Sequence, residues 1–154
     1  MRFKNMVLST VVALLMFCIS LPTAQAKPYI ENMTKYVEAT SASQLVDTAQ
    51  DYLGVSYCRG GTSPSCFDCS GFTQYVYNKR GIDIPRIAND QYQSSTKILI
   101  DGVVPGNLVF FINNGYAYHV GIYVGDRKVL HSPYPGSQIK IETIWTDNVR
   151  FGKF

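Results

Sequence analysis

The residue pattern of the chain changes from helical to strand-like near Val103, and this change limits the possible folds more than any other feature of the sequence. From there on, short runs of β-branched and aromatic residues alternate with turn-forming pairs such as Asn114-Gly115 and Gly125-Asp126. Short strands joined by tight turns typically form an antiparallel sheet. The predicted strands are 107–113, 118–124, 128–132 and 138–144, with 149–154 closing the sheet.

The residues before Val103 follow helical patterns instead. Ser43 is a suitable N-cap for a helix to about Tyr52, which Gly54 would end. A second helix is predicted from Cys69 to about residue 80, and a short third one covers about 86–95. Helices first and strands second indicate an α+β fold in which the helices pack on the antiparallel sheet.

The first residues of the chain have the pattern of a cleavable signal sequence. Arg2 and Lys4 precede an apolar run, and Ala24-Gln25-Ala26 has the small-residue form of a cleavage site. A permanent membrane anchor is the alternative, which the short apolar run and Pro22 disfavour. We therefore expect a secreted or periplasmic protein. The predicted organisation is a signal sequence at 1–26, an extended or partly ordered arm at 27–42 and one domain at 43–154.

The charge of the chain gives no indication of a nucleic-acid partner. Without Arg2 and Lys4, 12 of the 14 basic residues remain against 11 acidic ones. No stretch of the sequence concentrates the basic residues, and binding to phosphates needs clustered Lys and Arg. Nucleic-acid binding is therefore not expected.

Three cysteines follow the predicted signal: Cys58, Cys66 and Cys69. An odd number in an oxidising setting leaves one thiol unpaired. A flexible loop separates Cys58 from Cys66 and can bring them together, whereas Cys66 and Cys69 would have to pair across a helix start. We predict a Cys58–Cys66 disulfide. A zinc site is the alternative, but the cysteine spacing is not one that zinc sites commonly use.

Cys69 then lies free in the first turn of a predicted helix. The unpaired N–H groups and the positive end of the helix dipole favour an anion there, which predicts a lowered thiol pKa and a nucleophilic cysteine. A small buried residue at a helix start is the alternative interpretation. The local sequence does not decide between the two.

The only two histidines of the chain, His119 and His131, fall on neighbouring predicted strands. With an odd-length connection centred on Asp126 they lie on one face of the sheet as diagonal neighbours, whereas an even-length turn would place them on opposite faces. Two unrelated histidines are the alternative. On one face, they could act as the base for a cysteine nucleophile and as the group that orients this base.

Several motifs together resemble the NlpC family of papain-like bacterial cell-wall peptidases. They run from about Leu45 to the C-terminus. In order they are G-x-x-Y-x-x-G-G, D-C-S-G-F, P-R, P-G-x-L-V-F-F, H-V-G-I-Y-V-G and a final H. The resemblance implies a papain-like fold with Cys69 as nucleophile, His119 as base and His131 as the third catalytic residue.

The resemblance also implies substrate-binding residues. Tyr57 would place its hydroxyl at the site, Asp68 and Ser70 would bind a free amine or carboxylate of the substrate, and Arg86 would lie on the substrate side. The chain departs from the family after Pro85-Arg86, where Ile87 and Ala88 replace the usual Ser or Thr. It also has Asn107 where the family has Asp, which concerns a turn.

The predicted function is a cysteine endopeptidase that cuts peptidoglycan stem peptides at the γ-D-glutamyl bond to a diamino acid. Peptidoglycan or its muropeptide fragments are the expected partners, and no cofactor or metal is expected. One alternative is a catalytically silent cell-wall binding module, which the presence of all three catalytic residue types disfavours. Another is a papain-like amidase or acyltransferase with a different substrate.

Overall fold

The computed structural model describes residues 23–154. Contacts divide the chain into a first unit, residues 1–40, and a second unit, residues 41–154. In the first unit, residues 23–40 are helical and form the start of α2 (Thr23–Gln50). The predicted signal sequence lies outside the described residues, apart from its last four, and its cleavage stays a prediction.

Helix α2 corrects two expectations from the sequence. The segment 27–42 is helical rather than extended, and Ser43 lies inside the helix instead of capping it. Thr34 and Thr40 satisfy their hydroxyls within the helix by donating to the carbonyls four residues earlier. Several apolar residues of the segment, such as Ile30 and Tyr36, are exposed, and none of its described side chains is buried. Without a buried face, this segment has no apolar periodicity that sequence reasoning could detect.

The second unit is built on a six-stranded sheet, and its strands are antiparallel, as predicted. The strand order is β3-β8-β4-β5-β6-β7, which places β7 and β3 at the two edges. Sequence reasoning missed β3, a three-residue strand whose only partner among the described strands is β8. The bounds are β3 (Thr96–Ile98), β4 (Leu108–Asn113), β5 (Tyr116–Gly125), β6 (Lys128–His131), β7 (Lys140–Thr143) and β8 (Val149–Lys153).

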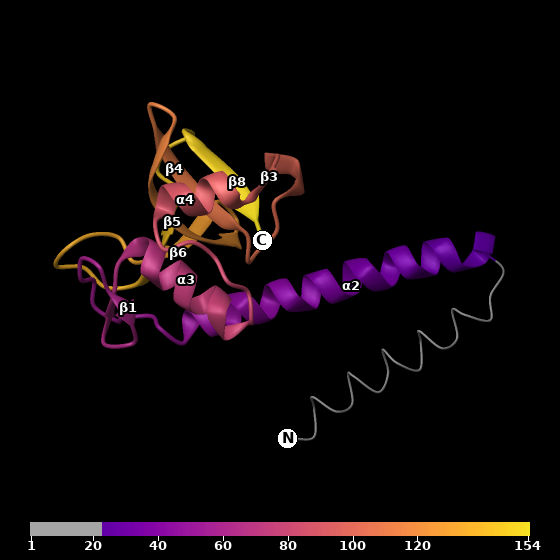
Figure 1. The fold of residues 1–154 in the computed structure, drawn as a ribbon, viewed down its shortest axis with the longest axis horizontal. Helices are drawn as coiled ribbons and strands as arrows, with labels where there is room; N and C mark the ends of the chain where they lie inside the picture. Colours follow the sequence, from indigo (N-terminus) through magenta and orange to yellow (C-terminus); the bar gives the residue numbers. More distant parts are fainter. Residues whose placement is uncertain (1–22) are drawn as a thin grey trace, which may run out of the picture. The chain divides into compact units, whose positions relative to one another are not determined.

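Helices α3 (Cys69–Lys79) and α4 (Ala88–Ser94) pack on β5 (Figure 1). A small hairpin of β1 (Thr62–Ser63) and β2 (Cys66–Phe67) directly precedes α3, and a 3₁₀ turn, η1 (Ile100–Gly102), follows β3. The predicted helices at 69–80 and 86–95 are therefore confirmed to within two residues at each end. Helices packed on an antiparallel sheet confirm the α+β class.

Both faces of the central strand β4 are buried, which divides the core into two clusters. Leu108 and Phe110 point toward the helices and join a cluster that includes Ala49 of α2 and Phe72 of α3. Val109 and Phe111 point the other way, into a smaller cluster with Val129, Ile144 and Phe151. The alternation follows from the two-residue period of a strand.

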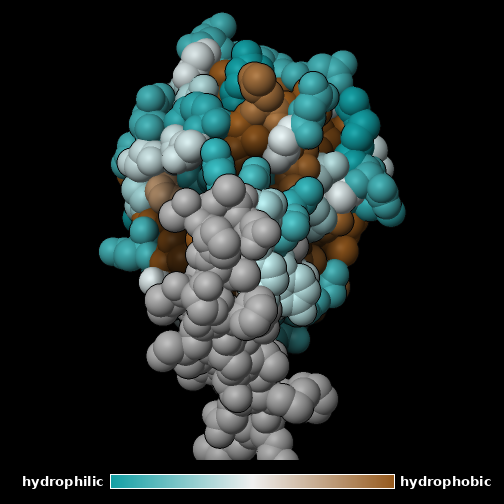
Figure 2. Space-filling model, turned by 90° about the vertical axis from the view of Figure 1, so that its right-hand side faces the viewer, coloured by the Kyte–Doolittle hydropathy of each residue, from teal (hydrophilic) through white to brown (hydrophobic). Residues whose placement is uncertain are grey.

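The surface carries isolated apolar side chains. Leu99 is 84% exposed, and Ile100 and Val104 are exposed as well. On the face drawn in Figure 2, hydrophobic areas are interrupted by hydrophilic side chains. Exposed apolar residues are normal at protein surfaces, and none of these three lines the cavity described below. Among the described residues, no helix combines the length and hydropathy that crossing a bilayer requires.

Candidate active site

One cavity of the second unit, of about 700 Å³, brings the three predicted catalytic residues together. Cys69 comes from the start of α3, His119 from β5 and His131 from the end of β6. Tyr57 lines the same cavity, as predicted. The remaining lining residues are Tyr118, Pro133, Tyr134, Glu142, Thr143 and Trp145.

Cys69 is the first residue of α3 and is partly buried. Burial raises the pKa of the Cys69 thiol, and the neighbouring Asp68 carboxylate adds to the rise, while backbone hydrogen bonds from Val120 and Ser70 offset it only in part. The expected lowering of the thiol pKa is therefore wrong for the protein without substrate. Removal of the thiol from water outweighs its favourable place at the helix start.

The two histidines lie on one face of the sheet, but the turn between them is not the predicted one. Asp126 and Arg127 form a two-residue turn, both with positive φ (49° and 55°), and Gly125 pairs with Lys128. By itself, a turn with an even number of residues would place the two histidines on opposite faces of the sheet. A register shift between Tyr123 and Gly125 adds one residue to β5 and restores the predicted register.

A glycine allows the two imidazoles to meet. Gly121 lies beside His131, and a Cβ atom at this position would be 2.9 Å from the Cβ of His131 and 2.4 Å from a methyl group of Val129. In the space that remains, Nε2 of His119 is 2.8 Å from Nδ1 of His131. Burial and the nearby His131 lower the pKa of His119 to about 3, and burial also lowers the pKa of His131.

Glu142 is a member of this group that sequence reasoning missed. Its Oε2 atom is 2.9 Å from Nε2 of His131, and its Oε1 atom is 2.7 Å from Nζ of Lys140. The hydrogen bond from Lys140, helped by His131, holds the pKa of the Glu142 carboxyl below its usual value. The register of β7 against β6 is the only signal that could have placed Glu142 beside His131.

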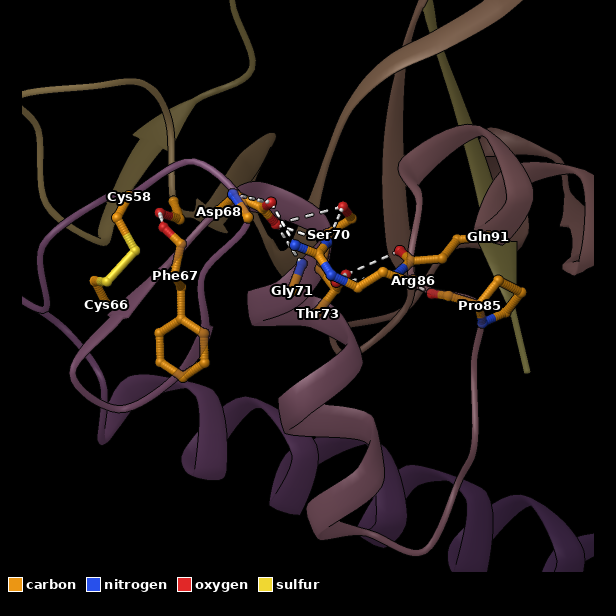
Figure 3. A network of polar contacts seen from close by, with 12 residues as sticks. Cys58, Cys66, Phe67, Asp68, Ser70, Gly71, Thr73, Pro85, Arg86 and Gln91 are labelled. Atoms are coloured by element: carbon orange, nitrogen blue, oxygen red, sulfur yellow. Dashed lines mark hydrogen bonds and ion pairs between the residues drawn. A yellow bond between two sulfur atoms is a disulfide. The ribbon is translucent and has the colours of Figure 1, made fainter.

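Asp68, Ser70 and Arg86 form a network beside the cavity rather than part of its lining (Figure 3). Asp68 caps α3 by accepting from the N–H of Gly71 at 2.7 Å, and it also accepts from the N–H of Gly60. Arg86 donates to both carboxylate oxygens of Asp68 and to Ser70. These contacts give Asp68 a structural role, and substrate binding by the three residues stays a prediction.

The predicted disulfide between Cys58 and Cys66 is confirmed, with 5.6 Å between the two Cα atoms. It closes the loop that contains Gly61, whose carbonyl accepts from the N–H of Asp68. The alternative of a zinc site at these cysteines is wrong, because two of the three sulfur atoms are bonded to each other. Within residues 23–154, no three His, Cys, Asp or Glu side chains are grouped so that they could hold a metal ion.

Trp145 covers one side of the histidine pair and was also missed. Its ring stacks on Phe111 with 4.0 Å between the centroids, and its centroid is 5.5 Å from that of His131. The indole is nevertheless about half exposed, like Tyr118 and Tyr134. Aromatic side chains that are wet on one side and packed on the other are common in ligand-binding sites.

The comparisons with known proteins agree with this geometry. The model of the NlpC/P60 family matches residues 54–150. The probable endopeptidase p60 of Listeria innocua is 44% identical over 71% of the chain, and the γ-D-glutamyl-L-lysine dipeptidyl-peptidase of Bacillus subtilis is 38% identical over 74% of it. The chain spans only 23% and 42%, respectively, of the length of these two relatives.

A solved structure supports the same relationship. The NlpC/p60 domain of the peptidoglycan hydrolase SagA superposes with a TM-score of 0.68 and 35% identity. The match covers 73% of this chain and 98% of that domain. The papain-like fold expected from the motifs is thereby confirmed. The chain belongs to the NlpC/P60 family, a family of cysteine peptidases.

Proposed function

We propose that the protein is a cysteine endopeptidase that hydrolyses stem peptides of peptidoglycan at the γ-D-glutamyl bond to a diamino acid. The observation that carries the proposal is the placement of Cys69, His119 and His131 around one cavity in a chain of the NlpC/P60 family. A nucleophile, a base and a group that orients the base are the parts that acyl transfer needs.

In this proposal Cys69 attacks the carbonyl carbon of the scissile bond while its proton passes to His119. Burial raises the pKa of the thiol and lowers that of His119, so both groups are neutral near pH 7 until the substrate binds. His119 then protonates the leaving amine, and water hydrolyses the thioester with the same histidine as base. His131 holds the ring of His119 in place.

The oxyanion that forms on the attacked carbonyl needs hydrogen-bond donors. The backbone N–H of Cys69, at the start of α3, is one of them. Tyr57 is suited to be the second, because burial, together with the nearby Cys69 and Asp68, raises the pKa of its hydroxyl and keeps it protonated.

The choice of bond rests on the relatives. The Bacillus subtilis relative is named for cleavage at a γ-D-glutamyl-L-lysine bond. A cavity of about 700 Å³ is large enough for a few residues of a short peptide. We infer export to the periplasm or the medium from the signal pattern at 1–26, which would bring the enzyme to this substrate.

Digestion of purified peptidoglycan, followed by mass spectrometry of the soluble fragments, tests the proposal. We expect fragments cut between D-glutamate and the diamino acid from the wild-type protein and none from the Cys69→Ala variant. Intact stem peptides released from the glycan would instead identify an amidase. Binding to peptidoglycan without any released fragment would identify a binding module. Either result would overturn the proposal.

A further inference from the structure

Glu142 contacts the ring nitrogen of His131 that His119 leaves free. In the β6–β7 register, Lys140 is opposite His131 and Glu142 is opposite Val129, so all four side chains share one face of the sheet. His131 is fully buried, while Glu142 is partly exposed. The carboxylate therefore reaches from the edge of the sheet to a buried imidazole.

The hydrogen bonds determine where the protons are. An ionised Glu142 can only accept, so Nε2 of His131 must carry a hydrogen. Because burial keeps His131 neutral, its Nδ1 atom is then an acceptor, and Nε2 of His119 must donate to it. This leaves Nδ1 of neutral His119 without a hydrogen. The same chain of bonds thus fixes the tautomers of both rings.

We propose that Glu142 is a positioning residue for catalysis, which fixes both histidine tautomers so that Nδ1 of His119 can take the proton of Cys69. This inference rests on the proposed function. The S–H bond of Cys69 breaks and an N–H bond forms at Nδ1, which leaves a thiolate and an imidazolium. The other hydrogens stay on their nitrogens, and the same proton later goes to the leaving amine. The negative charge of Glu142 stabilises the imidazolium through His131.

A surface ion pair with Lys140 is the competing explanation for Glu142. Each carboxylate oxygen, however, has its own partner: Oε2 contacts His131, and Oε1 contacts Lys140. Lys140 can therefore be removed without touching the contact to the histidine. This makes a Lys140→Met variant the matched control.

Other ionisable groups lie close to Lys140 or to the thiol. Tyr134 lies near Lys140, with the lysine nitrogen 5.5 Å from the ring centre. On the side of α3, Asp68 acts on Cys69, and Tyr57 faces the same thiol. None of these groups changes in the two variants compared here, so a difference between the variants reports on Glu142.

The first measurement is the tautomeric state of the histidines, from their ¹⁵N chemical shifts. The spectrum is simple because the chain has only two histidines. In the wild type we expect both rings protonated at Nε2 and bare at Nδ1. In Glu142→Gln the side-chain amide can donate as well as accept, so we expect a mixture of tautomers. Lys140→Met should keep the wild-type pattern.

The second measurement is the rate at which iodoacetamide alkylates Cys69 between pH 5 and 9, followed by mass spectrometry of the peptide that contains it. Glu142→Gln should lower both this rate at pH 7 and kcat/KM on peptidoglycan by about 10- to 100-fold, taking as a guide the loss seen when the hydrogen-bond partner of a metal-bound histidine is removed. Lys140→Met should stay within about threefold of the wild type, as expected for loss of an exposed ion pair.

Neither the shifts nor the alkylation requires turnover, so they separate this inference from the proposed function. Unchanged shifts and alkylation in Glu142→Gln, or an equal loss in Lys140→Met, would overturn the role of Glu142. If the wild-type protein shows the expected tautomers but leaves peptidoglycan intact, only the proposed substrate is wrong. If Glu142→Gln does not fold, Glu142→Asp decides: it keeps the charge but not the reach, and alkylation at the wild-type rate would overturn the proposal.

Discussion

The two halves of the site are held in different ways. The half that carries Cys69 is held by polar contacts and a cross-link: Asp68 caps α3 and pairs with Arg86, and a disulfide joins Cys58 to Cys66, eight residues later. The half that carries His119 and His131 depends on strand register, a bulge and a glycine. Polar contacts and a cross-link hold Cys69, whereas strand register and close packing hold the two histidines.

This difference implies different weaknesses. The carboxylate of Asp68 is ionically paired, so the nucleophile half should respond to the loss of charges. The histidine pair is buried in the neutral state, so its half should respond to acid and to added volume. The predictions below test this contrast, from the largest expected effect to the smallest.

Replacing the nucleophile or the base should have the largest effect. Cys69→Ala should lower turnover of peptidoglycan by about 10⁵-fold or more, and His119→Ala should be nearly as severe. His131→Ala should cost less, because it removes only orientation. Since the two groups act as a unit, the Cys69/His119 double variant should be little worse than Cys69→Ala alone. Losses that add up in the double variant would mean that the halves act independently.

Acid should destabilise the protein through the histidine half. In the unfolded chain His119 binds a proton near pH 6.5, and in the folded protein only near pH 3. Between these values the unfolded state binds more protons, so the free energy of unfolding falls as the pH falls. The slope from this group is at most about 1.4 kcal/mol per pH unit.

Urea denaturation at several pH values between 7.5 and 4 measures this effect. A His119→Gln variant should show a shallower dependence on pH, because it lacks the group that titrates. An identical slope in both proteins would show that the buried histidine does not contribute.

Removing a charge should destabilise the nucleophile half. Asp68→Ala removes the cap of α3 and leaves Arg86 unpaired, so we expect the free energy of unfolding to fall by about 2–4 kcal/mol. Asp147→Ala is the control, because its ion pair with Arg127 is exposed and should be worth less than about 1 kcal/mol. Urea denaturation measures both losses of stability. Equal losses would show that the two ion pairs contribute equally, against this prediction.

Added volume should disturb the histidine half. The new methyl group in Gly121→Ala would collide with Val129 and His131, and we expect a destabilisation of about 1–3 kcal/mol together with reduced activity. Gly102→Ala is the matched control, because its new methyl group would meet only a methyl group of Ile98, at 3.3 Å. Thermal unfolding and turnover of both variants provide the test. Full activity in Gly121→Ala would show that the histidine pair tolerates displacement.

The nucleophile half could be predicted from the sequence because its determinants are local. The turn-rich loop, the free Cys69 and the helix that begins there all follow from neighbouring residues. The disulfide followed from the odd number of cysteines and the flexible loop. The thiol pKa did not follow, because burial of Cys69 raises it, and burial arises only in the folded chain.

The histidine half could be predicted only in outline. The shared face of His119 and His131 was correct, but it arises from a bulge that no local pattern near Val124 indicates. Glu142 could not be found without the register of β7. The extension of α2 back to Thr23 was missed because the described side chains between 27 and 42 are not buried and so leave no periodic pattern.

Strand β7 is at the edge of the sheet and hydrogen-bonds as a strand only to β6 among the described strands. Edge strands open more readily than central ones, so the amide hydrogens of Lys140–Thr143 should exchange with solvent earlier than those of β4. Each opening would carry Glu142 away from His131 while α3 and its cap stay folded. On heating, the enzyme is therefore expected to lose activity through fraying of one short strand, at a temperature below that of global unfolding.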